Sequence, residues 1–445
     1  MINIVLASFI LYFVWNESTT KCLIGVFCYA TFHFFYSIFS LGSYSDLVMM
    51  HTGSGDLVVR LTGIIFILLI LSQLIVRLYK QAFSDRKVDI YFVIVMSLAF
   101  IGFVIHPTLK TALQIQNFFS IVAMLMLLWL MYVGLKVDSE KLNVRPRQLY
   151  ILNVIASVSL LIAFYEVFFQ LSWARSEFDG QVLYRASSFL FNPNLLGMWC
   201  AIVILGLSFL FHNNDKSLCK KSILLGIAIV SGSLYLSGSR SFIYLLILTL
   251  ILPLPLIRGQ RLLRLLTPVL ILIFTFVAVN SMSNFMVTRS DIITKNGWNS
   301  VAIVGERILN APLDIVQYIK SDKSDKSDKS DKSDKSVNIA IEGRFKGGYR
   351  DSGILVLFDD TGWLGLLAVI WLGWVFIFWA SKVYWIKKDA ASAYALTALI
   401  FCVTTGVSMR YQVFPVWVFI AIVLSPCLAL WRSVLLKVEK NDSIK

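Results

Sequence analysis

The chain is built around repeated apolar runs, most of them roughly 17 to 25 residues long, the length that an α-helix needs to cross a bilayer. Only 15% of its residues are charged, against about 25% in an ordinary soluble domain. The mean hydropathy is +0.76. We therefore predict an all-α polytopic membrane protein with about 13 transmembrane helices, within a range of about 12 to 14. The predicted spans are 2–15, 22–41, 61–79, 90–106, 117–135, 150–172, 192–211, 222–236, 241–257, 265–283, 363–383, 391–408 and 413–431.

Two local features bear on the number of spans and on the start of the chain. The runs on either side of Ser237–Ser241 fit two short helices or one broken element. No charged segment and small-residue cleavage site precede the first run, so we expect no cleavable signal peptide.

Basic residues are concentrated in every second connection between the runs. The positive-inside rule places these connections in the cytoplasm, so the other set faces outward. This distribution accounts for most of the net charge of +14, and we expect a lipid bilayer rather than a nucleic acid as the partner. The basic segments are Arg77–Lys87, Lys136–Arg147, Lys216–Lys221, Arg258–Arg264, Lys382–Lys388 and Arg432–Lys445.

One outward connection is much longer than the rest and divides the chain into three parts. Residues 1–283 hold the first ten predicted spans, 284–362 form the large outer loop, and 363–445 hold the last three spans and a cytoplasmic tail. Apolar residues at helical spacing over 308–319 predict an amphipathic helix lying on the outer membrane surface. The repeat of Ser, Asp and Lys over 321–336 has no apolar residue to bury, so we predict a disordered insert.

Several arginines lie in the outward-facing segments. The planar guanidinium always carries its charge and matches phosphate oxygens, so a group of arginines suits a diphosphate. Each one alone also fits an interfacial side chain that reaches to lipid headgroups. Arg240, in "LSGSRSF", has almost no loop through which to reach water, which favours a functional role. The candidates are Arg185, Arg240, Arg307, Arg344, Arg350 and Arg410.

The stretch "FNPNLLG" opens the seventh predicted span with two asparagines. Pro193 suits the first turn of a helix, and Asn192 can cap it. Capping explains one asparagine and leaves the second one, Asn194, without a structural reason. We therefore include Asn192 and Asn194 among the candidate substrate-binding residues.

Four stretches in this order resemble the Wzy-type O-antigen polymerase branch of the O-antigen ligase-like superfamily. They are "YRASSFLFNPNLLG", "LSGSRSF", "GERILNAPLDIV" and "RDSGILVLFDDTGWLGLL", and the similarity covers about residues 180–370. The resemblance implies a GT-C-type membrane glycosyltransferase of the bacterial inner membrane, with its active site on the periplasmic side. It would transfer a growing glycan from undecaprenyl diphosphate onto a new lipid-linked repeat unit. A polysaccharide chain-length regulator is the implied protein partner.

The resemblance also assigns roles to the outer-face residues, with no metal and no cofactor. Arg240, Arg307 and Arg350 would contact the diphosphates, and Arg185, Arg344 and Arg410 would support substrate binding. Asp351 would accept the proton of the acceptor hydroxyl or orient that hydroxyl. Asp351 equally fits an N-cap of the following helix or an ion pair with Arg350. Asp359 and Asp360, in "DDTGWLG", are interpreted as polar residues of a turn that re-enters the membrane.

Two other functions are compatible with parts of this pattern. Ligases of the same superfamily, which transfer the glycan to lipid A-core, carry a histidine where this chain has Asp351; none of its four histidines lies in the large loop. A flippase for lipid-linked oligosaccharides should show internal repeats and charged residues at mid-membrane. The two halves of this chain show no repeat, and the polar residues gather on one side. A purely structural membrane protein would not need so many arginines there.

Overall fold

A computed structural model describes residues 86–105, much of 118–129, 146–213 with short gaps, 217–251, 262–282, 353–388 and part of 392–402. The predicted spans 2–15, 22–41, 61–79 and 413–431, and nearly all of the large loop, lie outside the described residues. Short helical pieces occupy 118–129 and 392–402. The other elements are α5 (Arg86–Ile105), α7 (Pro146–Phe168), β1 (Arg175–Phe178), β2 (Gln181–Tyr184), α8 (Pro193–Asn213), α9 (Ser217–Ser237), α10 (Arg240–Ile251), α11 (Leu262–Met282) and α14 (Gly353–Lys387).

The described helices coincide with the predicted apolar runs, which confirms the helical class for this part of the chain. The runs around residue 238 form two helices, α9 and α10, because Gly238 takes a left-handed backbone conformation with φ of 59° between them. One element was not predicted: an antiparallel β-hairpin, β1–β2, in which Arg175 pairs with Tyr184. The total of about 13 spans and the GT-C class stay predictions.

Three of the described helices are long and apolar enough to cross a membrane: Pro193–His212, Lys220–Ser237 and Thr361–Lys387. They differ in burial. The protein buries 88% of the apolar segment of the first helix but 33% of that of the last. On α14, Trp374 and Phe378 are 68% and 61% exposed. A continuous apolar outer face of this length suits contact with lipid rather than with water.

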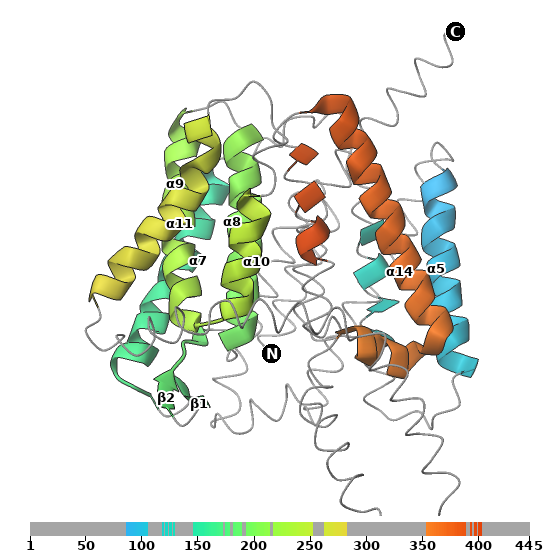
Figure 1. The fold of residues 1–445 in the computed structure, drawn as a ribbon, viewed down its shortest axis with the longest axis horizontal. Helices are drawn as coiled ribbons and strands as arrows, with labels where there is room; N and C mark the ends of the chain where they lie inside the picture. The colour runs from blue at the N-terminus through green and yellow to red at the C-terminus, as the bar shows by residue number, and fades with distance from the viewer. Residues whose placement is uncertain are drawn as a thin grey trace, which may run out of the picture.

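Helices α7 to α11 stand together as one group, and α5 packs along α14 (Figure 1). The Asn153 side chain of α7 donates hydrogen bonds to the carbonyl and hydroxyl oxygens of Ser222 in α9, both at 3.0 Å. Gly232, later in α9, meets Leu160, later in α7, so these two helices run in the same direction. Helix α8 is antiparallel to both, since Gly226 of α9 lies against Leu207 near the far end of α8.

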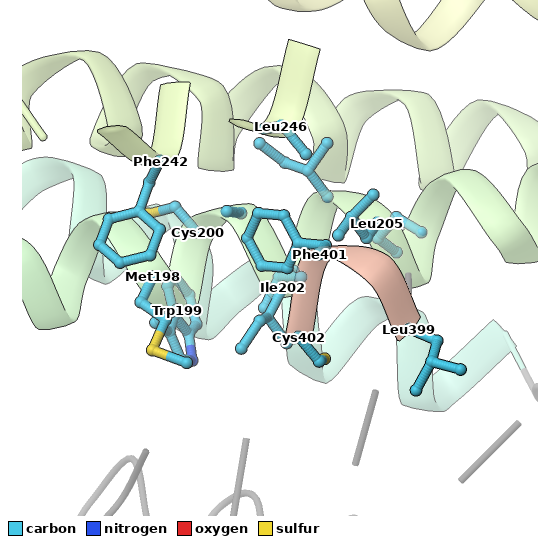
Figure 2. Close-up of a cluster of buried hydrophobic side chains, with 14 of the residues drawn as sticks. Met198, Trp199, Cys200, Ile202, Leu205, Phe242, Leu246, Leu399, Phe401 and Cys402 are labelled. Atoms are coloured by element: carbon cyan, nitrogen blue, oxygen red, sulfur yellow. The ribbon is translucent and has the colours of Figure 1, made fainter. Parts of the chain in front are cut away.

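Helix α8 forms the centre of the apolar core. Figure 2 shows Trp199 and Ile202 of α8 grouped with Phe242 of α10 and with Phe401 from the last described helical piece. Trp199 and Phe401 are among the largest fully buried side chains of the described residues. The buried thiols of Cys200 and Cys402 lie in the same cluster, consistent with small apolar side chains.

Helix α14 is kinked near its start. Gly362 has φ of 62° and ψ of −165°, a conformation that glycine adopts without the steric cost a Cβ would bring. The short segment before Gly362 lies across the end of the long one (Figure 1). The predicted re-entry turn is therefore a kink between two helical segments, and Asp359 and Asp360 belong to the first of them.

Close contacts between small residues stabilise this kink. The Thr361 hydroxyl donates to the carbonyl oxygen of Leu357 at 2.7 Å. A Cβ at Gly365 would overlap the Thr361 side chain, and a Cβ at Gly102 of α5 would overlap the Thr361 carbonyl oxygen. Gly102 lets α5 approach the backbone of α14 closely, whereas Gly365 leaves room for the Thr361 side chain within α14.

Replacing Gly365 by alanine is expected to lower the free energy of unfolding by about 1 to 3 kcal/mol, because the added methyl group has no room beside Thr361. Gly373→Ala is the matched control on the same helix, since a Cβ there meets no atom within 4 Å. The control should be neutral or stabilise by up to about 1 kcal/mol. Thermal unfolding in detergent, followed by tryptophan fluorescence, measures both. Equal stabilities of the two variants would contradict the packing described here.

Candidate functional site

Arg185 joins three segments at one end of the helix group. Its Nε donates to the carbonyl oxygen of Ser237 at 3.1 Å, at the end of α9. Its Nη2 lies 2.7 Å from Oδ1 of Asn194, in the first turn of α8, and 3.3 Å from Oγ of Ser239. One guanidinium therefore connects the segment after strand β2, the start of α8 and the α9–α10 turn, which lie up to 54 residues apart in the sequence. We call this group the Arg185 junction: Arg185, Asn194, Ser237 and Ser239.

Ser239 brings the start of α10 against the start of α8. Its hydroxyl has one proton and two possible acceptors, the carbonyl oxygen of Pro193 at 2.7 Å and Oδ1 of Asn194 at 3.4 Å. The shorter contact takes the proton, and the hydroxyl oxygen remains an acceptor for Arg185. A Cβ at Gly197 would lie 2.7 Å from Oγ of Ser239 and would overlap its Cβ. The glycine that ends "FNPNLLG" therefore allows α8 to approach this turn.

The turn between α9 and α10 reverses the chain within two residues. The Gly238 amide donates to the carbonyl oxygen of Tyr235 at 3.1 Å, and the Ser239 amide donates to Oγ of Ser237 at 3.2 Å. The Ser239 carbonyl accepts the first hydrogen bond of α10, from Ile243 at 3.2 Å. Ser239 is thus the N-cap and Arg240 is the first helical residue.

Two helices therefore begin at the Arg185 junction: α8 at Pro193 and α10 at Arg240. The start of a helix carries a partial positive charge from its aligned peptide dipoles and its free N–H groups. Arg185 adds a full positive charge beside them. The end of α9 at Ser237 lies in the same place and carries a partial negative charge, so Arg185 is the one full charge among the four residues of the junction.

A buried carboxylate supports the segment that follows Arg185. Glu166, near the end of α7, is 3% exposed. Its Oε2 accepts hydrogen bonds from the backbone amides of Ser187 and Ser188, both at 2.8 Å. Ser188 has φ of 49°, and its hydroxyl donates to the carbonyl oxygen of Ser159 at 3.0 Å. Glu166 was not among the predicted site residues. It is the single charged residue of the predicted span 150–172, and a charge inside an apolar span is a usual mark of function.

The structure brings together part of the predicted site. Arg185 and Asn194 are in direct hydrogen-bond contact, and the backbone of Arg240 begins α10 next to them. The grouping of the remaining candidates stays a prediction, because they lie outside the described residues: Asn192, Arg307, Arg344, Arg350, Asp351 and Arg410. The amphipathic helix predicted over 308–319 and the repeat over 321–336 lie outside them as well.

Among the residues that the structure describes, no three side chains of His, Cys, Asp or Glu lie close enough to hold a metal ion together. Comparison of the chain with protein-family models, with curated proteins and with solved structures found no match.

Proposed function

We propose that the chain is a membrane glycosyltransferase that polymerises the repeat units of O-antigen or a related surface polysaccharide on undecaprenyl diphosphate. The observation that supports this most directly is the Arg185 junction. Two of the four stretches that carry the resemblance, "YRASSFLFNPNLLG" and "LSGSRSF", meet there through hydrogen bonds of 2.7 to 3.3 Å. A glycosyltransferase of this kind needs a cationic site for a diphosphate, to which Arg185 would contribute one positive charge.

In the proposed reaction, the hydroxyl oxygen of the acceptor sugar forms a bond to the anomeric carbon of the donor glycan. The bond from that carbon to undecaprenyl diphosphate breaks, and the diphosphate leaves with the electron pair. The hydroxyl proton passes to the Asp351 carboxylate, the proposed base. Because the diphosphate is already a good leaving group, the main requirement is stabilisation of its developing negative charge. The helix starts at Pro193 and Arg240, together with Arg307 and Arg350, would provide this.

The distribution of charge along the helices supports a periplasmic location for the site. The β-hairpin and the start of α14 lie at the same end of the molecule, the lower one in Figure 1. Lys220 and Lys221 lie near the opposite end of α9 from the junction, and Lys387 and Lys388 lie at the far end of α14. The positive-inside rule assigns basic ends to the cytoplasm, so the junction would face the periplasm of a bacterial inner membrane.

Removing the gene from the organism that produces it, and then restoring it, tests the proposal. Gel analysis of lipopolysaccharide should change from a ladder to core with a single repeat unit, and back to a ladder when the gene is restored. Polymerisation fails without the enzyme, whereas transfer of one unit to the core does not need it. The proposal is wrong if the deletion strain keeps its ladder.

The same deletion strain distinguishes the alternatives. Loss of a ligase would leave polymer attached to undecaprenyl diphosphate and a core without any repeat unit. Loss of a flippase would leave the core bare and single repeat units on the cytoplasmic side. Either pattern would replace the proposed function with that alternative.

A further inference from the structure

Glu166 is a charged side chain in surroundings that disfavour charge. It is 3% exposed, and it lies in a helix whose other described residues within 150–168 are uncharged. A carboxylate in an apolar region is retained when strong hydrogen bonds compensate for the lost hydration. The two backbone amides at 2.8 Å provide such bonds, both to the same oxygen, Oε2.

The two amides belong to a strained turn. Ser188 has φ of 49°, which a residue with a Cβ adopts at a steric cost that surrounding contacts must offset. The contacts on this turn come from α7: the Glu166 carboxylate holds the Ser187 and Ser188 amides, and the carbonyl oxygen of Ser159 accepts from the Ser188 hydroxyl at 3.0 Å. Glu166 therefore accepts the hydrogen bonds of both backbone amides of this turn.

The same segment determines where Arg185 points. The Arg185 amide donates to the carbonyl oxygen of Ala174 at 2.7 Å, and the Ala186 amide donates to that of Leu236 at 3.0 Å. The segment is thus held at its start by the hairpin and α9, and at its end by Glu166. A change in the turn at 187–188 would shift the backbone of Arg185 relative to its acceptors in α8 and α9.

We propose that Glu166 is a positioning residue that acts through the turn at Ser187 and Ser188. It holds Arg185 in hydrogen-bond contact with Asn194 and Ser239. These contacts fix the start of α8 relative to the start of α10 at the proposed diphosphate site. The catalytic part of this statement rests on the proposed function. The role needs the acceptor oxygen of Glu166 rather than its negative charge or its proton.

Glutamine and alanine at position 166 separate the acceptor from the charge. A single oxygen, Oε2, accepts both amides, and the amide oxygen of glutamine can take its place. Glu166→Gln is expected to keep at least about a third of the polymerisation activity, whereas Glu166→Ala should lose about tenfold to a hundredfold, the usual effect of a misplaced binding group. Equal loss in the two variants would show that the charge itself is required and would overturn the inference.

A rescue experiment tests the route through the turn. Glycine adopts positive φ without steric cost, so Ser188→Gly added to Glu166→Ala should raise the activity by at least about threefold over Glu166→Ala alone. Ser187→Gly in the same background is the matched control, because Ser187 is not in the left-handed region. Rescue by the control to the same extent, or no rescue by Ser188→Gly, would overturn the proposed route.

Amide hydrogen exchange provides a readout that does not depend on the reaction. In the purified full chain in detergent, a peptide covering 185–188 should exchange faster in Glu166→Ala than in the unchanged protein and in Glu166→Gln. Unchanged protection in Glu166→Ala would overturn the positioning role, whatever the lipopolysaccharide gels show. A result in which protection changes as expected, but the unchanged chain makes no ladder, would support the positioning role and contradict the proposed polymerase function.

Discussion

Arg240→Ala is expected to abolish the polysaccharide ladder while the protein stays in the membrane. Arg240 is the first residue of α10, directly after Ser239 in the Arg185 junction. Arg240 is proposed to stabilise the negative charge that develops on the leaving diphosphate, and loss of one such group lowers the rate of an enzyme by about 10²–10³. A decrease of that size removes all products longer than one or two repeat units. Gel analysis of lipopolysaccharide and immunoblotting of membrane fractions together measure the effect.

Arg175 provides the matched control for this experiment. It lies in strand β1 of the hairpin, on the side proposed to face the periplasm, but the resemblance gives it no role. Arg175→Ala should therefore leave the ladder at its normal length. Arg350→Ala should behave like Arg240→Ala, because both arginines are proposed to contact a diphosphate. A normal ladder from Arg240→Ala, or loss of the ladder from Arg175→Ala, would contradict the assignment of the site.

Gly197→Ala is expected to disrupt the Arg185 junction without removing any charge. The added methyl group would overlap Ser239, so α8 and the α9–α10 turn must separate. Overpacking of this kind lowers the free energy of unfolding by about 1 to 3 kcal/mol. The shift also moves Asn194 and Arg240 relative to each other, so we expect loss of most of the polymer. Thermal unfolding in detergent and the ladder assay measure the two consequences separately.

Gly206 is the control on the same helix, because a Cβ there meets no atom within 4 Å. Gly206→Ala should leave the ladder unchanged and alter stability by less than about 1 kcal/mol. Adding Ser239→Gly to Gly197→Ala removes the overlapping atoms and should restore part of the lost stability. If Gly197→Ala is as stable and as active as Gly206→Ala, the close approach of α8 to Ser239 is not required.

The helices of the described regions were predictable because their signal is local. The apolar run predicted over 192–211 corresponds to α8 at Pro193–Asn213, and the run over 265–283 corresponds to α11 at Leu262–Met282. Each run carries the length and hydropathy of a membrane helix without reference to the rest of the chain. The separation of α9 from α10 was left open, because small residues such as those in "SGS" fit both a turn and a broken helix.

Two features were missed although the sequence contained a signal for each. The hairpin has an Asp-Gly pair, residues 179 and 180, between two four-residue strands, which is a strong indicator of a tight turn. Glu166 is the one charge in a long apolar run. Neither signal indicates a ligand, because both features act on the backbone around Arg185, whereas an arginine matches a phosphate by its own charge.

The sequence by itself determined the helical class, the positions of the described helices, the apolar length that would let some of them cross a membrane, and the stretches in which polar residues concentrate. These follow from apolar length and charge distribution, which are properties of each segment alone. Only the tertiary structure decided that Arg185 contacts Asn194 and Ser239, and that Glu166 holds the turn beside them. These contacts depend on how α7, α8 and α9 pack, with Gly197 permitting a close approach that no segment specifies on its own.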